Sequence, residues 1–158
     1  MVKLKEIEEF FLEASRQTYA ADAPKTTIAE LPKSKVLRYE RGDWLYVDLY
    51  FSANGKSFGQ TIVWHQDQPV WGMQYRGDWD KSDERVIPFL KSALKTAYDQ
   101  GEFRGGRGPE YFENADGSLK YINHLPNSIF TNFSGDEKIY ASGKGFVLYH
   151  AFNSITLI

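Results

Sequence analysis

A carboxylate among aromatic side chains is the first feature of this sequence that could do chemistry. The segment Trp44–Phe51 alternates in the manner of a strand, which places four side chains on one face: Trp44, Tyr46, Asp48 and Tyr50. Loss of water around Asp48 would raise the pKa of its carboxyl group. Three roles therefore stay open for Asp48: a general acid or base, a polar contact to a ligand, or a buried carboxylate held by a tyrosine, an indole or a backbone donor.

The next predicted strand, Phe58–Gln66, adds two side chains with polar tips, Gln60 and Trp64. If this strand forms a hairpin with the preceding one, we expect both side chains near the face of Tyr46 and Asp48. The predicted ligand-binding site thus consists of six residues: Trp44, Tyr46, Asp48, Tyr50, Gln60 and Trp64.

A glycine-rich segment, 101–109, carries Arg104 and Arg107. Guanidinium groups bind anions through paired hydrogen bonds, so these two arginines form a second, anion-binding candidate. The alternative is a flexible connecting loop whose arginines are solvated. The segment lacks the spacing of a phosphate-binding P-loop, which excludes that kind of site.

The other catalytic and metal-binding patterns are missing from the sequence. It contains no cysteine and no G-x-S-x-G segment, and its 3 histidines do not have the spacing of a metal site. His65 and Asp67 offer two ligands, too few for a metal, and are expected to flank a turn. The acidic residues Asp78, Asp80 and Asp83 are expected to cap the following helix. We therefore predict no catalytic residue, no metal and no cofactor.

Composition limits the class of protein. A chain of 158 residues has the length of one domain, and its net charge of −2 lacks the basic excess of a nucleic-acid binder. Charged residues interrupt the start of the chain, so no signal peptide is expected. No apolar run is long enough for a membrane span. The cytoplasm is therefore the default location. The 4 Trp, 10 Tyr and 11 Phe suit either strands or the lining of a pocket.

Two amphipathic helices are predicted, at about Val2–Tyr19 and Asp83–Asp99, each with one apolar stripe. Ser82 is the expected N-cap of the second helix, and Gly101 is its expected stop. Pro88 disfavours a helix interior, so an alternative places it in the first turn, with 82–87 as a lead-in.

The remaining segments alternate as strands do. Beside the two described above, strands are predicted at 38–41, 70–76, 111–113, 119–124, 129–133, 138–141, 146–151 and 154–158. In the segment Trp44–Phe51 the predicted core face consists of Leu45, Val47, Leu49 and Phe51. The stripe Trp71, Met73 and Tyr75 is either core beneath the first helix or a surface on which a ligand stacks.

The two halves of the chain resemble each other. Phe11-Leu12 with Thr18 recurs as Phe89-Leu90 with Thr96, and each helix is followed by about four strands. We predict one α+β domain, 1–158, internally duplicated at about 1–80 and 81–158, in which two tandem α-β-β-β-β halves form antiparallel sheet and the helices pack on one face. The face of Trp44, Tyr46, Asp48 and Tyr50 is then the candidate open surface; whether the halves share one sheet stays open.

Four blocks of the sequence resemble an uncharacterised bacterial domain family: Asp48-Leu-Tyr50, Phe58-Gly-Gln60, Pro69-Val-Trp71-Gly-Met73-Gln-Tyr75-Arg-Gly77 and Phe103-Arg-Gly105. The resemblance covers about 1–152, with Thr61 where an acidic residue is usual and 152–154 where a glycine-rich turn is usual. Domains of this family often follow a repressor-type (Cro/XRE-like) helix-turn-helix, which implies a link to regulation. No activity comes with the family.

The sequence thus favours a non-catalytic module that binds or senses a small molecule. Two alternatives stay open. The aromatic face could be covered by a protein partner or a second copy, or the chain could be a small hydrolase-type enzyme acting through Asp48 or His65. Direct binding of nucleic acid through the Arg104 and Arg107 loop is not expected.

Overall fold

The computed structural model describes residues 2–126 and 130–158, and its first helix, α1, spans Leu4–Gln17. The predicted apolar stripe is buried from Ile7 onward, with Ile7, Phe10 and Ala14 fully inaccessible, whereas Leu4 at the start of the helix is exposed. The helix is two residues shorter at each end than predicted. At its start the carboxylate of Glu6 accepts a hydrogen bond from the backbone N–H of Lys3 (2.7 Å), which satisfies one of the donors that a helix leaves free there.

The second helix, α2, spans Val86–Asp99 and begins later than predicted. Ser82 is not its N-cap; Arg85 precedes the first helical residue, and the Ser82 hydroxyl donates to Asp80 instead (2.5 Å). Pro88 lies in the first turn, as the alternative interpretation has it, where a missing N–H costs no helical hydrogen bond. Gly101 follows the helix with a positive φ of 68°, which confirms it as the stop.

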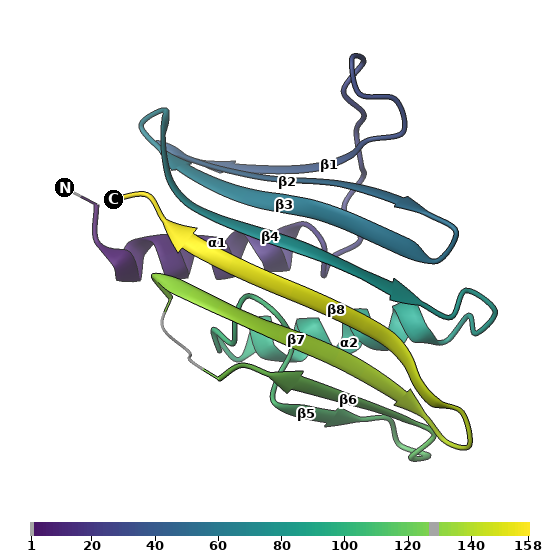
Figure 1. The fold of residues 1–158 in the computed structure, drawn as a ribbon. Helices are drawn as coiled ribbons and strands as arrows, with labels where there is room; N and C mark the ends of the chain where they lie inside the picture. The colour runs from purple at the N-terminus through teal and green to yellow at the C-terminus, as the bar shows by residue number, and fades with distance from the viewer. Residues whose placement is uncertain (1, 127–129) are drawn as a thin grey trace.

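All the strands join one antiparallel sheet (Figure 1). They are β1 (Lys35–Arg41), β2 (Trp44–Ala53), β3 (Lys56–His65), β4 (Gln68–Trp79), β5 (Tyr111–Glu113), β6 (Leu119–His124), β7 (Asn132–Ala141) and β8 (Gly145–Thr156). Their order is β1-β2-β3-β4-β8-β7-β6-β5, so each half is a helix followed by a four-stranded meander, and the halves meet where β4 pairs with β8. The α+β prediction is confirmed, and both halves contribute to a single sheet.

The second half has fewer, longer strands than predicted. The segments predicted at 146–151 and 154–158 are one strand, β8, and the segment 138–141 is the end of β7. The predicted strand 129–133 begins outside the described residues, and its described end enters β7 at Asn132. From their residue types, Gly135 and Asn153 suggest breaks between strands. In the structure both residues pair within the ladder of β7 and β8.

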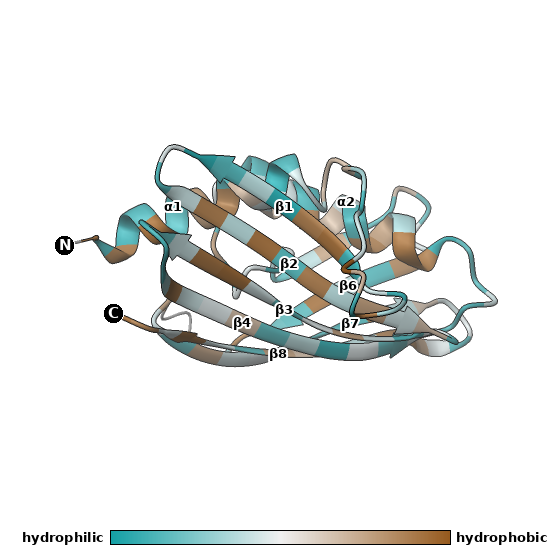
Figure 2. Ribbon diagram, turned by 90° about the horizontal axis from the view of Figure 1, so that it is seen from above, coloured by the Kyte–Doolittle hydropathy of each residue, from teal (hydrophilic) through white to brown (hydrophobic). Residues whose placement is uncertain are grey.

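Both helices lie on the same side of the curved sheet, and no helix covers the other side (Figure 2). The side that the helices cover is called the helix face below, and the other side is called the open face. The faces of β2 are reversed relative to the prediction. Tyr46 and Asp48 are buried on the helix face, whereas Leu45, Val47, Leu49 and Phe51 are only half-buried.

The reversal in β2 has a physical reason. Phe10 stacks on Trp44 (5.1 Å between ring centroids) and Phe11 lies 6.1 Å from Tyr46, so rings from α1 cover the aromatic side of the strand. Phe11 also lies 4.9 Å from Trp71, which with Met73 is buried and confirms the core interpretation of that stripe. The alternation of β2 is therefore correct, but large aromatic side chains fill the core better than the aliphatic set.

The glycine-rich loop after α2 is packed against the core, contrary to the alternative of a flexible loop. Gly105, Gly106 and Gly108 are buried, and a Cβ at Gly106 would lie 2.7 Å from the Phe11 ring. Gly106 also has a positive φ of 67°. This backbone needs glycine both for its conformation and for its contact with α1.

We expect Gly106→Ala to lower the free energy of unfolding by roughly 2–4 kcal/mol, because a left-handed alanine and an overpacked contact each carry a cost. Urea unfolding measures the change. Gly143→Ala is the matched control, since Gly143 has a φ of 76° but open space around it, and should cost only about 1–2 kcal/mol. Equal losses for the two variants would contradict the close contact with Phe11.

Candidate functional site

A polar cavity of about 60 Å³ lies between the helices and the sheet. Its aromatic lining consists of Phe11, Tyr19, Tyr46, Tyr50, Tyr75 and Tyr98, and its polar lining of Ser15, Asp48, Ser57, Thr61, Arg107 and His150. Tyr19, Tyr50 and Ser57 are half-buried, whereas Asp48, Arg107 and His150 are buried. The charged side chains are therefore at the inner end of the cavity.

Asp48 lies in the middle of β2 and is 4% exposed. Its Oδ1 accepts hydrogen bonds from the Tyr75 hydroxyl (2.6 Å) and the Thr61 hydroxyl (3.1 Å). Burial raises the pKa of the Asp48 carboxyl group to about 6, although the two hydroxyls and Arg107 act in the opposite direction. Of the roles left open by the sequence, the structure shows the tyrosine-bound buried carboxylate.

Glu137 of β7 is fully buried and joins three neighbours. Its Oε1 accepts from Arg107 Nε (3.1 Å) and lies 2.8 Å from His150 Nδ1, while Oε2 accepts from the Tyr121 hydroxyl (2.6 Å). Burial alone would raise the pKa of Glu137, but Arg107 and His150 outweigh it and lower that pKa to about 2. Glu137 is therefore ionised and neutralises Arg107.

His150 of β8 has one free nitrogen. Its side chain is buried and Nδ1 faces Glu137, but Nε2 is buried without a hydrogen-bond partner among the described residues. Gly77, its partner in the ladder of β4 and β8, makes room for the ring, because a Cβ at Gly77 would lie 1.9 Å from His150 Cδ2. The cavity thus contains a fixed imidazole with an unused polar atom, which is rare in a folded interior.

Hydrogen bonds to the loop backbone fix the position of Arg107. Asn123 Nδ2 donates to the carbonyls of Arg104 (3.0 Å) and Gly108 (2.8 Å), and the Tyr98 hydroxyl donates to the carbonyl of Gly106 (2.7 Å). The Arg107 guanidinium also lies 5.9 Å from the centre of the Tyr75 ring. Side chains from α2 and β6 therefore hold Arg107 in place beside the cavity.

The predicted ligand-binding residues separate into two groups. Tyr46, Asp48 and Tyr50 line the cavity, and Trp44 packs near it between Phe10 and His65. The expectation that Gln60 and Trp64 join them is wrong. The two pair with Leu49 and Leu45, so they lie on the open face.

The open face has a larger hollow, of about 850 Å³, whose lining includes Gln60, Gln74 and Arg76. These three side chains are exposed, and the hollow contains no buried charged group. Water reaches these polar groups, so they need no ligand to satisfy their hydrogen bonds. We therefore place the candidate site in the smaller cavity.

The two arginines of the anion-binding candidate do not converge. Arg107 pairs with Glu137, and Arg104 Nη2 lies 3.1 Å from Glu110 Oε2 near the surface. Each guanidinium has its own carboxylate, which leaves little positive charge for an anion.

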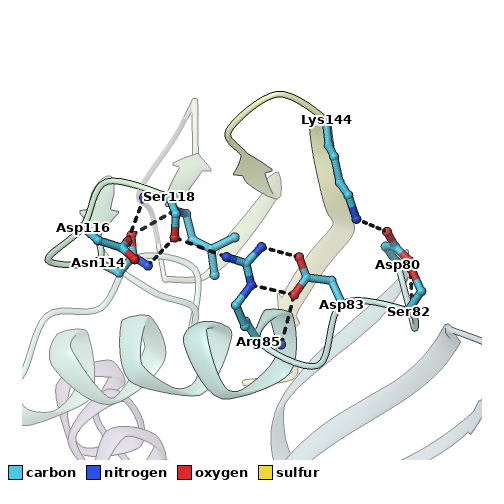
Figure 3. Close-up of polar contacts among 9 residues, drawn as sticks. Asp80, Ser82, Asp83, Arg85, Asn114, Asp116, Ser118 and Lys144 are labelled. Carbon is cyan, nitrogen blue, oxygen red and sulfur yellow. Dashed lines mark hydrogen bonds and ion pairs between the residues drawn. The ribbon is translucent and has the colours of Figure 1, made fainter.

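The acidic residues before α2 serve the local structure (Figure 3). Asp80 accepts from the backbone and side chain of Ser82, and Asp83 forms an ion pair with Arg85 (2.6 Å). Figure 3 shows Lys144 and Ser118 approaching these residues from neighbouring turns. In the described part of the chain, no group of three histidine or acidic side chains is arranged to hold a metal ion.

Glu137, His150 and Tyr98 are site residues that the sequence alone does not reveal. Glutamate and histidine in an alternating strand normally point to water, and no local pattern marks them as buried. The one available signal is Gly77 in the block that ends Tyr75-Arg-Gly77, because a glycine inside a strand indicates a close neighbour.

The arrangement can bind a polar molecule or exchange a proton with one. Asp48 offers a carboxylate oxygen, Oδ2, on which no hydrogen bond from the described residues ends, and His150 offers Nε2. A carboxylate that orients an imidazole, as Glu137 does, also occurs where histidine moves a proton.

We expect Asp48→Asn to raise the free energy of unfolding by up to about 3 kcal/mol near neutral pH. The folded pKa of Asp48 is raised to about 6, so its stability contribution is fully present below the unfolded pKa and is lost as pH rises through about 6. The gain from the variant should therefore shrink on acidification below pH 6. Urea unfolding across this pH range measures it.

Asp83→Asn is the matched control, because Arg85 lowers the pKa of Asp83 to about 2. The stability contribution of the Asp83 carboxylate is present above the unfolded pKa, so this variant should lose stability at neutral pH. We expect a loss of under about 1 kcal/mol, because the Arg85 side chain of the pair is exposed. A loss of stability in both variants at neutral pH would contradict the assignment of Asp48 as an uncompensated carboxylate.

We expect Glu137→Gln to lower the free energy of unfolding by roughly 3–5 kcal/mol, because Arg107 would stay buried without a counter-charge. Thermal and urea unfolding measure the loss. The control Glu110→Gln removes the partner of the more accessible Arg104 and should cost under about 1 kcal/mol. Similar losses in the two variants would show that Glu137 does not compensate a buried charge.

Comparison with known proteins identifies the family but no activity. No curated protein and no solved structure is detectably similar to this chain. In the described residues, neither helix has the length and apolar character needed to cross a membrane. Residues 48–153 match a domain of unknown function (DUF5680), a range that contains Asp48, Arg107, Glu137 and His150. The chain belongs to this DUF5680 family.

Proposed function

We propose that this chain is a small-molecule binding module whose ligand occupies the polar cavity between the helices and the sheet. The observation that carries the proposal is the buried Asp48, which lines the cavity and whose Oδ2 accepts no hydrogen bond from the described residues. A buried acceptor left unpaired costs about 1–3 kcal/mol, and a bound polar molecule would remove this cost.

A second observation agrees with the proposal. The cavity has polar groups on all sides, from α1 (Ser15), the sheet (Asp48, Thr61, His150) and the loop after α2 (Arg107). Binding sites typically combine an apolar lining with a few convergent polar groups. Because groups from both halves of the chain converge here, a ligand would connect the two halves.

The wider role is part of the proposal. The resemblance to domains that accompany a helix-turn-helix supports a cytoplasmic sensor, in which ligand binding is passed to a regulatory partner. The open face, with its exposed Phe58 and Ile155, is the surface that a partner or a second copy would cover. The enzymatic alternative would use the Glu137–His150 pair on a molecule in the same cavity.

Ser15 allows a test that blocks the cavity without touching its charged groups. Ser15 is buried and lines the cavity beside Tyr46, so a leucine there should fill part of the cavity. We expect Ser15→Leu to abolish binding and Ser15→Ala, the matched control, to keep it. Binding is measured by adding small polar molecules one at a time and recording ¹H–¹⁵N spectra. In the wild-type chain we expect chemical-shift changes at the residues that line the cavity.

Two results would overturn the proposal. One is a set of wild-type shifts confined to the open face, for instance at the Trp64 indole N–H. The other is undiminished binding by a folded Ser15→Leu variant. Either would place the ligand or partner elsewhere on the sheet.

A further inference from the structure

We propose that the ligand of this cavity is a small primary amine in its protonated form, whose ammonium group binds between Asp48 and the tyrosine rings. This inference rests on the proposed function and adds the chemical class of the ligand.

Among the described residues that line the cavity, one buried carboxylate has no ion-pair partner. Arg107 is neutralised by Glu137, which accepts from its guanidinium inside the core. Asp48 has no such partner: its two hydrogen bonds come from the neutral hydroxyls of Tyr75 and Thr61. Among the described residues no cationic side chain forms an ion pair with Asp48. A buried carboxylate without a counter-charge is costly, and a cationic ligand would supply that charge.

The hydrogen-bonding atoms that remain are acceptors. Both donors to Asp48 end on Oδ1, so Oδ2 is free to accept. Tyr19 and Tyr50 also line the cavity, and their hydroxyl oxygens can accept a hydrogen bond. Such acceptors suit an ammonium group, which has only donors. An anion would be repelled by Asp48.

The aromatic lining also favours a cation. Tyr19, Tyr46, Tyr50 and Tyr75 line the cavity, and the faces of such rings attract positive charge. The Arg107 guanidinium already lies 5.9 Å from the centre of the Tyr75 ring. Burial raises the pKa of these tyrosines, so they stay neutral and their hydroxyls keep their protons.

The size of the cavity limits the ligand. A volume of 60 Å³ corresponds to roughly four or five water-sized atoms. A short aliphatic amine, or the amine end of a longer molecule that leaves past the half-buried Tyr19 and Tyr50, fits this space.

Three probes of similar size and different charge test the proposal: propylammonium, propan-1-ol and propionate. Each is titrated into the wild-type chain at neutral pH, and ¹H–¹⁵N and aromatic spectra follow the cavity residues. We expect propylammonium to bind at least about tenfold more tightly than the other two. Tetramethylammonium, which has the charge but no N–H donor, should bind more weakly than propylammonium.

Two variants examine the residues that recognise the amine. Asp48→Asn should weaken propylammonium binding at least about tenfold, whereas Asp67→Asn, in a turn outside the cavity, should not. Tyr50→Leu keeps an apolar side chain at the edge of the cavity and should weaken binding roughly threefold or more through loss of the ring face. Tyr50→Leu tests recognition of the amine independently of Asp48, so the proposal can still be tested if Asp48→Asn does not fold.

The outcomes separate the two proposals. If propan-1-ol or propionate binds in the cavity as tightly as propylammonium, or if folded Asp48→Asn binds propylammonium normally, the amine assignment is overturned and the small-molecule cavity stands. If none of the probes shifts a cavity resonance of the wild-type chain, the amine assignment is overturned and the proposed function loses its support as well.

Discussion

The fold depends on keeping Glu137 ionised beneath the helix layer. A carboxylate in this position must be paired and fully hydrogen-bonded, and its partners come from three places: Tyr121 on β6, His150 on β8 and Arg107 on the loop after α2. The loop can deliver Arg107 only by packing Gly106 against Phe11 of α1. One buried charge thereby determines the path of the loop, the room needed at Gly77 and the orientation of the imidazole.

The two halves use equivalent positions differently. Thr61 pairs with Asp48 on β2 and with Met73 on β4, whereas Glu137 pairs with Asn123 on β6 and with His150 on β8. The first half thus has its carboxylate on the second strand of the meander, and the second half has it on the third. In the described part of the chain, the carboxylate of the second half forms an ion pair with Arg107, and Asp48 forms none. Asp48 is therefore the buried carboxylate that lacks a counter-charge, and it lines the cavity.

How far the sequence could predict this arrangement depended on the kind of interaction. Periodicity located both helices and most strands, because alternation and helical spacing are local properties. It could not say which side of β2 faces the helices, since both sides are apolar and the choice depends on Phe10 and Phe11 from a distant helix. Gln60 and Trp64 were assigned to the wrong face for a different reason: the register of the β2–β3 hairpin pairs them with Leu49 and Leu45.

The candidate site was predicted only where a polar residue stood out from its neighbours. Asp48 was found because it interrupts an aromatic strand, and its tyrosine partner was one of the roles considered for it. Glu137 and His150 could not be found, because their burial follows from a contact with Arg107 that is 30 residues away from Glu137 in the sequence. Glycine spacing suggested an anion site in the loop, whereas the glycines serve to bring one arginine into the core.

The remaining cavity is best understood as a consequence of these charges. A close-packed core tolerates few voids, and apolar side chains could have filled this one at little cost. Here the wall includes a carboxylate held by two neutral hydroxyls and an imidazole whose Nε2 is unpaired. The residues that line this space include Asp48, Arg107 and His150, whose side chains also take part in the buried hydrogen bonds. Filling the space with apolar side chains would therefore disturb those bonds, whereas a ligand that brings its own charge would leave them in place and compensate Asp48.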